Sequence, residues 1–259
     1  MSDTDLTTRL THPDHPRSNT YDARWTIENQ MGPHALWLLE WLAPALGLDT
    51  LPPGARVLDL GCGRAMTSVF LAKEYGLQVT AADLWVKPDE NAVRIAEAGV
   101  ADRVLPLRVE AHDIPFAEGT FDAIVSIDAY QYFGTADLYL PTVTRLLKPG
   151  GRIGVVMPAL REELAGDEPP EHLKPFWDPG FWAFHSPAWW RRHWTRGGVE
   201  VETADWQPDG WKDWLLWSEV CAEESPYAWM ADMARDSVDL VKADRGQLLG
   251  FTRVVGRRV

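Results

Sequence analysis

The fold of this chain is decided by the stretch Val57-Leu58-Asp59-Leu60-Gly61-Cys62-Gly63. An apolar run ends there in a carboxylate and a glycine-spaced turn, and a helical pattern follows over residues 65–75. A strand, a tight loop and a helix in this order expose backbone N–H groups beside a small ligand. A single Gly-x-Gly has low specificity, so its meaning depends on the signals that follow it along the chain.

Strand and helix patterns alternate regularly around this loop. Strands are predicted at 57–60, 78–82, 104–108, 122–127 and 152–157, and helices at 65–75, 89–98 and 136–147. Such alternation is typical of βαβ units around a parallel sheet. The strands at 57–60 and 122–127 are apolar on both faces, as expected where helices cover both sides of a sheet.

The chain beyond Pro158 has a different composition, and 10 of the 14 tryptophans lie between Trp177 and Trp229. Capping residues and breakers predict a helix from Ser186-Pro187 to Gly197-Gly198. Further helices are predicted at 211–222 and 226–243, and strands at 199–204 and 248–255. We therefore expect an α/β fold, Rossmann-like and doubly wound. It has a mostly parallel seven-stranded sheet, helices on both faces and a helical, Trp-rich insertion near the C-terminus.

Composition and charge narrow the class of protein. The 259 residues suffice for one domain with a large core, and 38 acidic side chains outnumber 25 basic ones. A nucleic-acid partner is disfavoured, because proteins that bind a phosphate backbone usually present a basic face. No apolar stretch approaches the roughly 20 residues that cross a bilayer, and residues 1–20 lack a signal peptide's apolar core. We expect a cytoplasmic protein with no membrane partner.

The two cysteines, Cys62 and Cys221, are not spaced as metal ligands or as a disulfide framework. No metal site is predicted. Cys62 is expected to fill its loop rather than to act as a nucleophile.

Three further signals follow the glycine loop in order. Asp83 ends the strand at 78–82, and Glu110-Ala111-His112-Asp113 follows the strand at 104–108. The third signal is Lys148-Pro149-Gly150-Gly151, which we expect to form a turn before the strand at 152–157. With these signals the chain resembles the class I S-adenosylmethionine-dependent methyltransferases over residues 35–158. It is most similar to their small-molecule branch, which includes ubiquinone/menaquinone-type, sarcosine/dimethylglycine-type and cyclopropane-synthase-like enzymes.

The resemblance implies S-adenosylmethionine as the cofactor. Gly61 and Gly63 would let the backbone approach the ligand where a Cβ would clash. The acid at Asp59 would orient the amino end of the cofactor, and Asp83 would accept two hydrogen bonds from the ribose diol. The full set of expected cofactor contacts is Asp59, Gly61, Cys62, Gly63, Asp83, Leu84, Trp85, Glu110, Ala111, His112, Asp128 and Ala129.

Two positions depart from the family pattern. Glu110 stands where the family usually has Asp, so the adenine amino group has either Glu110 or Asp113 as its acceptor. Ala65 replaces a third glycine that many members carry. A nicotinamide dinucleotide fits less well, because Met66 occupies the place of the third glycine in its fingerprint.

The acceptor is expected beside the segment after strand 122–127. Asp128, Tyr130 and Tyr132 could line its pocket, although Tyr132 and Phe133 could equally be packing residues. A pocket role is favoured for one of the two tyrosines. An Asp/Asn-Pro-Pro-aromatic motif, common in enzymes that methylate bases or glutamine, is absent. A hydroxyl acceptor would need a base, for which His185 is preferred to His112 because His112 adjoins the expected cofactor loop.

The tryptophans allow two interpretations. Trp190 and Trp194 on one helix, and Trp211, Trp214 and Trp217 on another, have spacings that place rings on one helix face. They either dock helices on the sheet or wall a water-excluding chamber, to which Trp25 and Trp85 could also belong. The segment from Trp25 to Met31 could fold over the cofactor as a lid.

The predicted organisation is a flexible N-terminal arm at 1–20 and a single methyltransferase domain at 21–259. Within the domain we expect a helical lid at 21–50, a cofactor-binding core at 55–158, a substrate-side region at 159–245 and a final strand at 247–257. The predicted function is methyl transfer to N, O or S of a small-molecule acceptor, by in-line displacement in an aromatic-walled pocket. The alternatives are a cyclopropane-forming or C-methylating enzyme on a lipid-like substrate, and a catalytically silent S-adenosylmethionine-binding regulator. The oligomeric state stays open.

Overall fold

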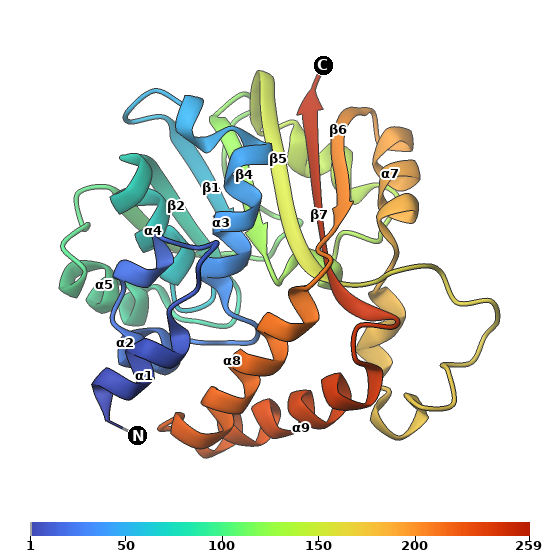
Figure 1. The fold of residues 1–259 in the computed structure, drawn as a ribbon. Coiled ribbons are helices and arrows are strands. Elements are labelled where there is room, and N and C mark those ends of the chain that lie inside the picture. Colours follow the sequence, from blue (N-terminus) through green and yellow to red (C-terminus); the bar gives the residue numbers. More distant parts are fainter. Residues whose placement is uncertain (1) are drawn as a thin grey trace.

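Seven strands form one sheet in the order β3-β2-β1-β4-β5-β7-β6 in the computed structural model, which describes residues 2–259 (Figure 1). The strands are β1 (Arg56–Leu60), β2 (Gln78–Asp83), β3 (Val104–Arg108), β4 (Phe121–Ile127), β5 (Leu147–Leu160), β6 (Val199–Trp206) and β7 (Leu249–Arg258). Strands β1 to β5 pair in parallel, and β7 runs antiparallel to both β5 and β6. The expected doubly wound, mostly parallel sheet is confirmed.

Nine α-helices accompany the sheet in the described residues. They are α1 (Asp3–Leu10), α2 (Ala23–Glu28), α3 (Ala35–Leu46), α4 (Met66–Tyr75), α5 (Pro88–Glu97), α6 (Tyr139–Thr144), α7 (Pro187–Arg196), α8 (Gly210–Glu224) and α9 (Ala228–Asp244). No helix within residues 2–259 is both long and apolar enough to cross a membrane.

The two faces of the sheet carry separate cores because successive side chains of a strand point to opposite sides. On β1, Val57 packs with α3 and α4, whereas Leu58 packs with α6 and α7. The same alternation holds along β4, where Val125 joins the first core and Ile124 the second. Both faces are therefore covered, which explains the apolar runs in these strands.

The helix expected at 136–147 is shorter, and the following strand longer, than predicted. β5 begins at Leu147, which pairs with Phe121, and the register shifts before Ala123 pairs with Arg152. The Lys148-Pro149-Gly150-Gly151 segment lies within this irregular start of β5, where Gly150 takes the left-handed conformation. Pairing with β4 thus extends the strand through residues expected to form a separate turn.

The N-terminal segment is not the flexible arm expected from its polar composition. Residues 3–10 form α1, which Ser2 caps by accepting a hydrogen bond from the Asp5 N–H. Leu6 is 0% exposed and packs in a third core with Trp217 and Val220 of α8. Figure 1 shows α1 and α2 beside the orange α8 and red α9, below the sheet in that view. Two apolar side chains one helical turn apart anchor a segment whose other residues are polar.

We predict that Leu6→Ala lowers the free energy of unfolding by about 2–5 kcal/mol, because a buried leucine is replaced by a cavity. Urea denaturation measures this change. Leu138→Ala is the matched control, since Leu138 is 80% exposed and surface changes stay within about 0.5 kcal/mol. Equal stabilities for the two variants would contradict the packing of α1.

Candidate active site

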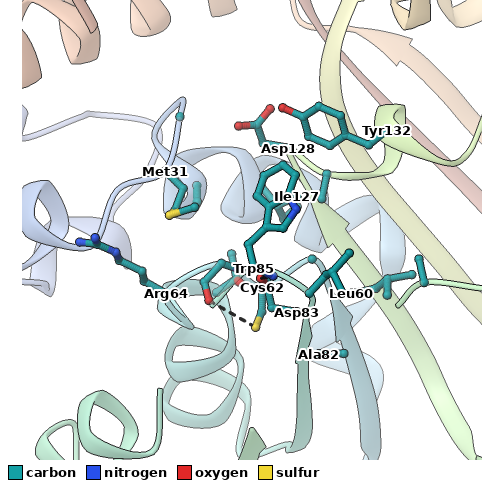
Figure 2. Close-up of a pocket in the computed structure, with 18 of the residues that line it drawn as sticks. Met31, Leu60, Cys62, Arg64, Ala82, Asp83, Trp85, Ile127, Asp128 and Tyr132 are labelled. Atoms are coloured by element: carbon teal, nitrogen blue, oxygen red, sulfur yellow. Dashed lines mark hydrogen bonds between the residues drawn. The ribbon is translucent and has the colours of Figure 1, made fainter. Parts of the chain in front are cut away.

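A cavity of about 290 Å³ opens at the carboxyl ends of β1, β2 and β4 (Figure 2). Strand order changes direction between β1 and β4, and open α/β sheets bind ligands at such a switch point. The predicted site residues that line the cavity are Gly61, Cys62, Gly63, Asp83, Leu84, Trp85, Glu110, Ala111, His112, Asp128, Ala129 and Tyr132. Asp59, Tyr130 and His185 do not line it.

Gly61 in the glycine loop leaves no room for a side chain. Gly61 has φ +75°, and a Cβ on it would lie 2.3 Å from the Cβ of Ala129. Its N–H donates to the Ala82 carbonyl oxygen at 2.8 Å, as the Cys62 N–H does at 3.1 Å. Loop and second strand are thereby joined, and the backbone borders the cavity directly.

Ala65 stands where many members of the family have a third glycine, and its backbone conformation shows why glycine suits this position. This residue precedes α4 in the left-handed conformation, with φ 63°, and is completely buried. An L-residue there is disfavoured by roughly 1–2 kcal/mol relative to its ordinary conformations, whereas glycine is not. Ala65 still takes this left-handed conformation. Alanine in place of glycine therefore adds backbone strain but does not change the shape of the loop.

Asp83 holds the loops after β1 and β2 together. Its Oδ2 accepts from the Gly63 N–H at 2.8 Å. Its Oδ1 accepts from the N–H groups of Trp85 and Val86 at 2.8 and 2.9 Å. The carboxylate is nearly buried at the cavity wall, so three charge-assisted hydrogen bonds fix its orientation.

Asp59 lies behind the loop rather than on the cavity. Its Oδ2 accepts hydrogen bonds from the hydroxyls of Thr67 and Ser68, at 2.6 and 2.5 Å, in the first turn of α4. Its Oδ1 finds no hydrogen-bond partner within residues 2–259. Burial raises the pKa of Asp59 to about 6. These contacts position α4.

Cys62 is buried in the loop. Burial raises the pKa of its thiol well above the ordinary value. The thiol is therefore protonated at neutral pH, as suits a packing residue rather than a nucleophile.

Glu110 and His112 form an exposed pair at the β3 side of the cavity. The His112 backbone N–H and Nδ1 lie 2.9 Å from the two carboxylate oxygens of Glu110. Hydrogen bonds from His112 lower the pKa of Glu110. Asp113 does not line the cavity, so of the two acids considered for the adenine contact only Glu110 borders it.

Asp128 follows β4 in a left-handed conformation, with φ 53°. Its carboxylate lies against Gly32, where a Cβ would be 2.2 Å from Oδ2. Burial raises the pKa of Asp128 to about 7, against a smaller opposite effect of the Gln131 amide. A carboxyl with this pKa can take up or release a proton near neutral pH.

Trp85 and Tyr132 stand at the mouth of the cavity, 66% and 65% exposed. Their ring centroids are 5.6 Å apart in an edge-to-face arrangement. Figure 2 shows the Asp128 carboxylate and the Tyr132 hydroxyl at the same end of the pocket, beyond the Trp85 indole.

The other tyrosine, Tyr130, is a core residue. It is 0% exposed and packs between Trp190 and Trp194 of α7, with ring centroids 5.7 and 5.5 Å away. The position of Tyr130 therefore contradicts a pocket role. Both tryptophans share a core with sheet residues such as Leu58 and Ile124, so they dock α7 on the sheet.

The preferred base, His185, lies in a different part of the molecule. Its Nδ1 is 3.0 Å from the Glu163 carboxylate, and its ring stacks on Trp189 at 3.8 Å. It borders a second hollow formed by residues between 160 and 185. The prediction that His185 serves as base is not supported by this placement, because no part of the residue reaches the cavity.

Part of the segment expected to form a lid borders the cavity, although Trp25 does not. Asn29, Met31, Gly32, Pro33 and Ala35 line the cavity, whereas Trp25 packs on Tyr21 at 5.6 Å. The Trp217 Nε1–H donates to the Gly32 carbonyl at 2.9 Å, which fastens the lid to α8. The aromatic wall thus consists of Trp85, Tyr132 and Phe133 rather than the tryptophan-rich helices.

Arg64 is a cavity residue that the sequence analysis missed. Its guanidinium donates to the Glu28 carbonyl oxygen at 2.6 Å and lies over the Tyr227 ring at 4.8 Å. Its place directly after Gly63 was the available signal, since Gly61, Cys62 and Gly63 all border the cavity.

Comparison with known proteins agrees with this architecture. Residues 57–151 match the family model of the methyltransferase domain. A 2-methyl-6-phytyl-1,4-hydroquinone methyltransferase of Synechocystis sp. is 37% identical over 106 residues, 40% of this chain and 32% of that protein. A glycine/sarcosine/dimethylglycine N-methyltransferase of Actinopolyspora halophila is 28% identical over 160 residues, 60% of this chain and 27% of that protein. The chain thus spans less than a third of either curated relative.

Among solved structures, phosphoethanolamine N-methyltransferase 2 of Haemonchus contortus in complex with S-adenosyl-L-methionine superposes with a TM-score of 0.67. The superposition covers 100% of this chain and 60% of that one at 21% identity, which supports the fold alone. The resemblance to S-adenosylmethionine-dependent methyltransferases expected from the sequence is confirmed. The matched segment holds β1, the glycine loop, Asp83 and Asp128, and we identify residues 57–151 as a methyltransferase domain.

Proposed function

We propose that this domain transfers a methyl group from S-adenosylmethionine to a small-molecule amine. One observation carries the proposal: the carboxylates of Asp83 after β2 and Asp128 after β4 both border the cavity. Hydrogen bonds fix the first, and burial raises the pKa of the second to about 7. These two strands flank β1 on opposite sides. One acid is therefore available to hold the cofactor, and the other to serve the acceptor.

The residues present fit the cofactor, which supplies a methyl group on a positively charged sulfur. Gly61 and Gly63 line the cavity with backbone alone, and a Cβ on them would lie 2.3 Å from the Ala129 Cβ and 3.1 Å from the Met31 Cγ. A carboxylate has about four acceptor sites, and backbone N–H groups use three of those on Asp83. We therefore propose that the Asp83 carboxylate accepts a hydrogen bond from one ribose hydroxyl of the cofactor rather than from two. Arg64 provides a positive charge for the cofactor's carboxylate, and Glu110 an acceptor for the adenine amino group.

Asp128 is the group we assign to the acceptor's proton. An ammonium ion must lose a proton before its nitrogen can attack, and a nearby carboxylate with a pKa of about 7 can accept it. The faces of Trp85 and Tyr132 next to this carboxylate suit a cation, because aromatic rings attract positive charge. The lid residue Gly32, packed on Asp128, helps to keep bulk water from this end of the cavity.

We predict that Asp83→Asn weakens S-adenosylmethionine binding by about 1–3 kcal/mol, or roughly 5- to 150-fold in Kd. The amide cannot accept from both the Gly63 N–H and the ribose while also facing Trp85 and Val86. Isothermal titration calorimetry measures the Kd, with Asp113→Asn as control because Asp113 lies outside the cavity. A Kd for Asp83→Asn within twofold of wild type would show that Asp83 does not contribute to cofactor binding.

Activity should depend on pH through Asp128. The base must be deprotonated to act, so kcat/KM is expected to rise with pH and level off above about 7, following the raised pKa of Asp128. Asp128→Asn should lower kcat by about 10²–10⁴-fold and abolish this rise of kcat/KM with pH. Any rise with pH that remains in the variant reflects deprotonation of the amine substrate itself. An unchanged profile in Asp128→Asn would assign the proton transfer to another group.

The acceptor class is tested by release of S-adenosylhomocysteine from amines, phenols and thiols of similar size. Amines should support turnover, and their rate should fall when Trp85 is replaced by alanine, since the cation loses an aromatic face. Turnover only with phenols or thiols would support methyl transfer by this domain but refute an amine as the acceptor. If none of the three classes gave turnover while the Kd for S-adenosylmethionine stayed tight, a silent regulatory protein would be favoured.

A further inference from the structure

Two histidines and an aspartate converge on the far side of the lid. His12 and His15 follow α1 with two residues between them, and Asp213 projects from α8. One potential ligand atom from each of the three lies within 4.8 Å of the other two. The His12 Nε2 is 3.1 Å from the Asp213 Oδ1. Segments 200 residues apart in sequence thus bring three ligand-type side chains to one point.

The backbone around the histidines is held in place independently of these contacts. The Asn19 side chain accepts from the His12 N–H and donates to the His12 carbonyl, both at 2.8 Å. The Glu40 carboxylate accepts from the N–H groups of Arg17 and Ser18 at 2.9 Å. The loop that carries both imidazoles is therefore preorganised, which lowers the entropy that a ligand must overcome.

His15 has an unsatisfied nitrogen. The residue is 4% exposed, and its Nδ1 finds no hydrogen-bond partner in the described part of the chain. A buried polar atom without a partner is destabilising by about 1–3 kcal/mol, and such atoms call for a specific explanation.

We propose that His12, His15 and Asp213 bind a divalent transition-metal ion, with zinc as the best fit. Two imidazoles, one carboxylate and a water complete the four-coordinate shell that zinc prefers. Ligation at the Nε2 of His12 requires the tautomer with hydrogen on Nδ1, so the 3.1 Å contact from the Asp14 N–H is given up. This site departs from the expectation that the chain binds no metal, and it does not depend on the proposed function.

The metal would fasten the segment after α1 to α8 beneath the lid. The His15 ring stacks on Trp37 at 6.1 Å, and His34 stacks on the same tryptophan at 4.1 Å. His34 also contacts Trp217 edge-to-face at 4.3 Å. Trp217 donates a hydrogen bond to the Gly32 carbonyl at the cavity wall. A metal ion bound to His15 would therefore stabilise the ring contacts with Trp37 and Trp217 that hold this wall in place.

The test uses the full chain, freed of metal by a chelator and then titrated with Zn²⁺ by calorimetry. One Zn²⁺ per chain is expected, with a Tm raised by several degrees in the presence of excess ion. Asp213→Asn keeps an oxygen acceptor for His12 but loses the charge, and should bind Zn²⁺ at least about 10-fold more weakly. Co²⁺ in place of Zn²⁺ should give the intense visible absorption of a tetrahedral site.

Asp209→Asn is the matched control, since it removes an exposed carboxylate near the start of the same helix and outside the cluster. It should bind Zn²⁺ like wild type. His15→Gln serves as a second variant and should also bind more weakly. The proposal is overturned if the metal-free wild type takes up no stoichiometric Zn²⁺. Equal binding by Asp213→Asn, His15→Gln and wild type would likewise place the ion elsewhere.

Discussion

The three hydrogen bonds to the Asp83 carboxylate are the constraint on which the site depends. They join the N–H of Gly63 in the loop after β1 to those of Trp85 and Val86 in the loop after β2. Neither loop has regular secondary structure, so neither could keep its place through its own backbone ladder. The Asp83 carboxylate at the end of β2 accepts hydrogen bonds from both loops. It thereby fixes the position of the two loops where they border the cavity.

The opposite wall depends on a different kind of contact. Asp128 takes a left-handed backbone conformation that side chains rarely adopt, and the absence of a side chain at Gly32 leaves room for its carboxylate. Gly32 is itself held by Trp217 from α8. The acid end of the cavity is therefore shaped by a helix inserted between β6 and β7, far from the matched domain segment in sequence.

The regular elements could be predicted because their signals are local. Apolar runs, glycines and capping residues place most strands and helices to within a few residues, and the glycine loop leads directly to the cavity. The two tyrosines could not be separated in this way. Tyr130 and Tyr132 occupy one short turn, and only the position of α7 decides that Tyr130 is buried while Tyr132 faces the cavity. His185 could not be placed from the sequence, because its contact with Glu163 depends on the path of a long loop. Helix α1 was missed because its polar residues outnumber the two leucines that anchor it.

The packing of α1 against α8 has a consequence for how the molecule is assembled. Leu6 and Ile27 share their core with Trp217 and Ala234, so the first helices cannot be buried until the last ones exist. During synthesis the parallel strands can pair earlier, since domains fold progressively as the chain emerges. Contacts this distant in sequence also form slowly. The burial of the first helices is thus a late event. A product truncated before α8 would also lack β7, the strand that joins β6 to the rest of the sheet.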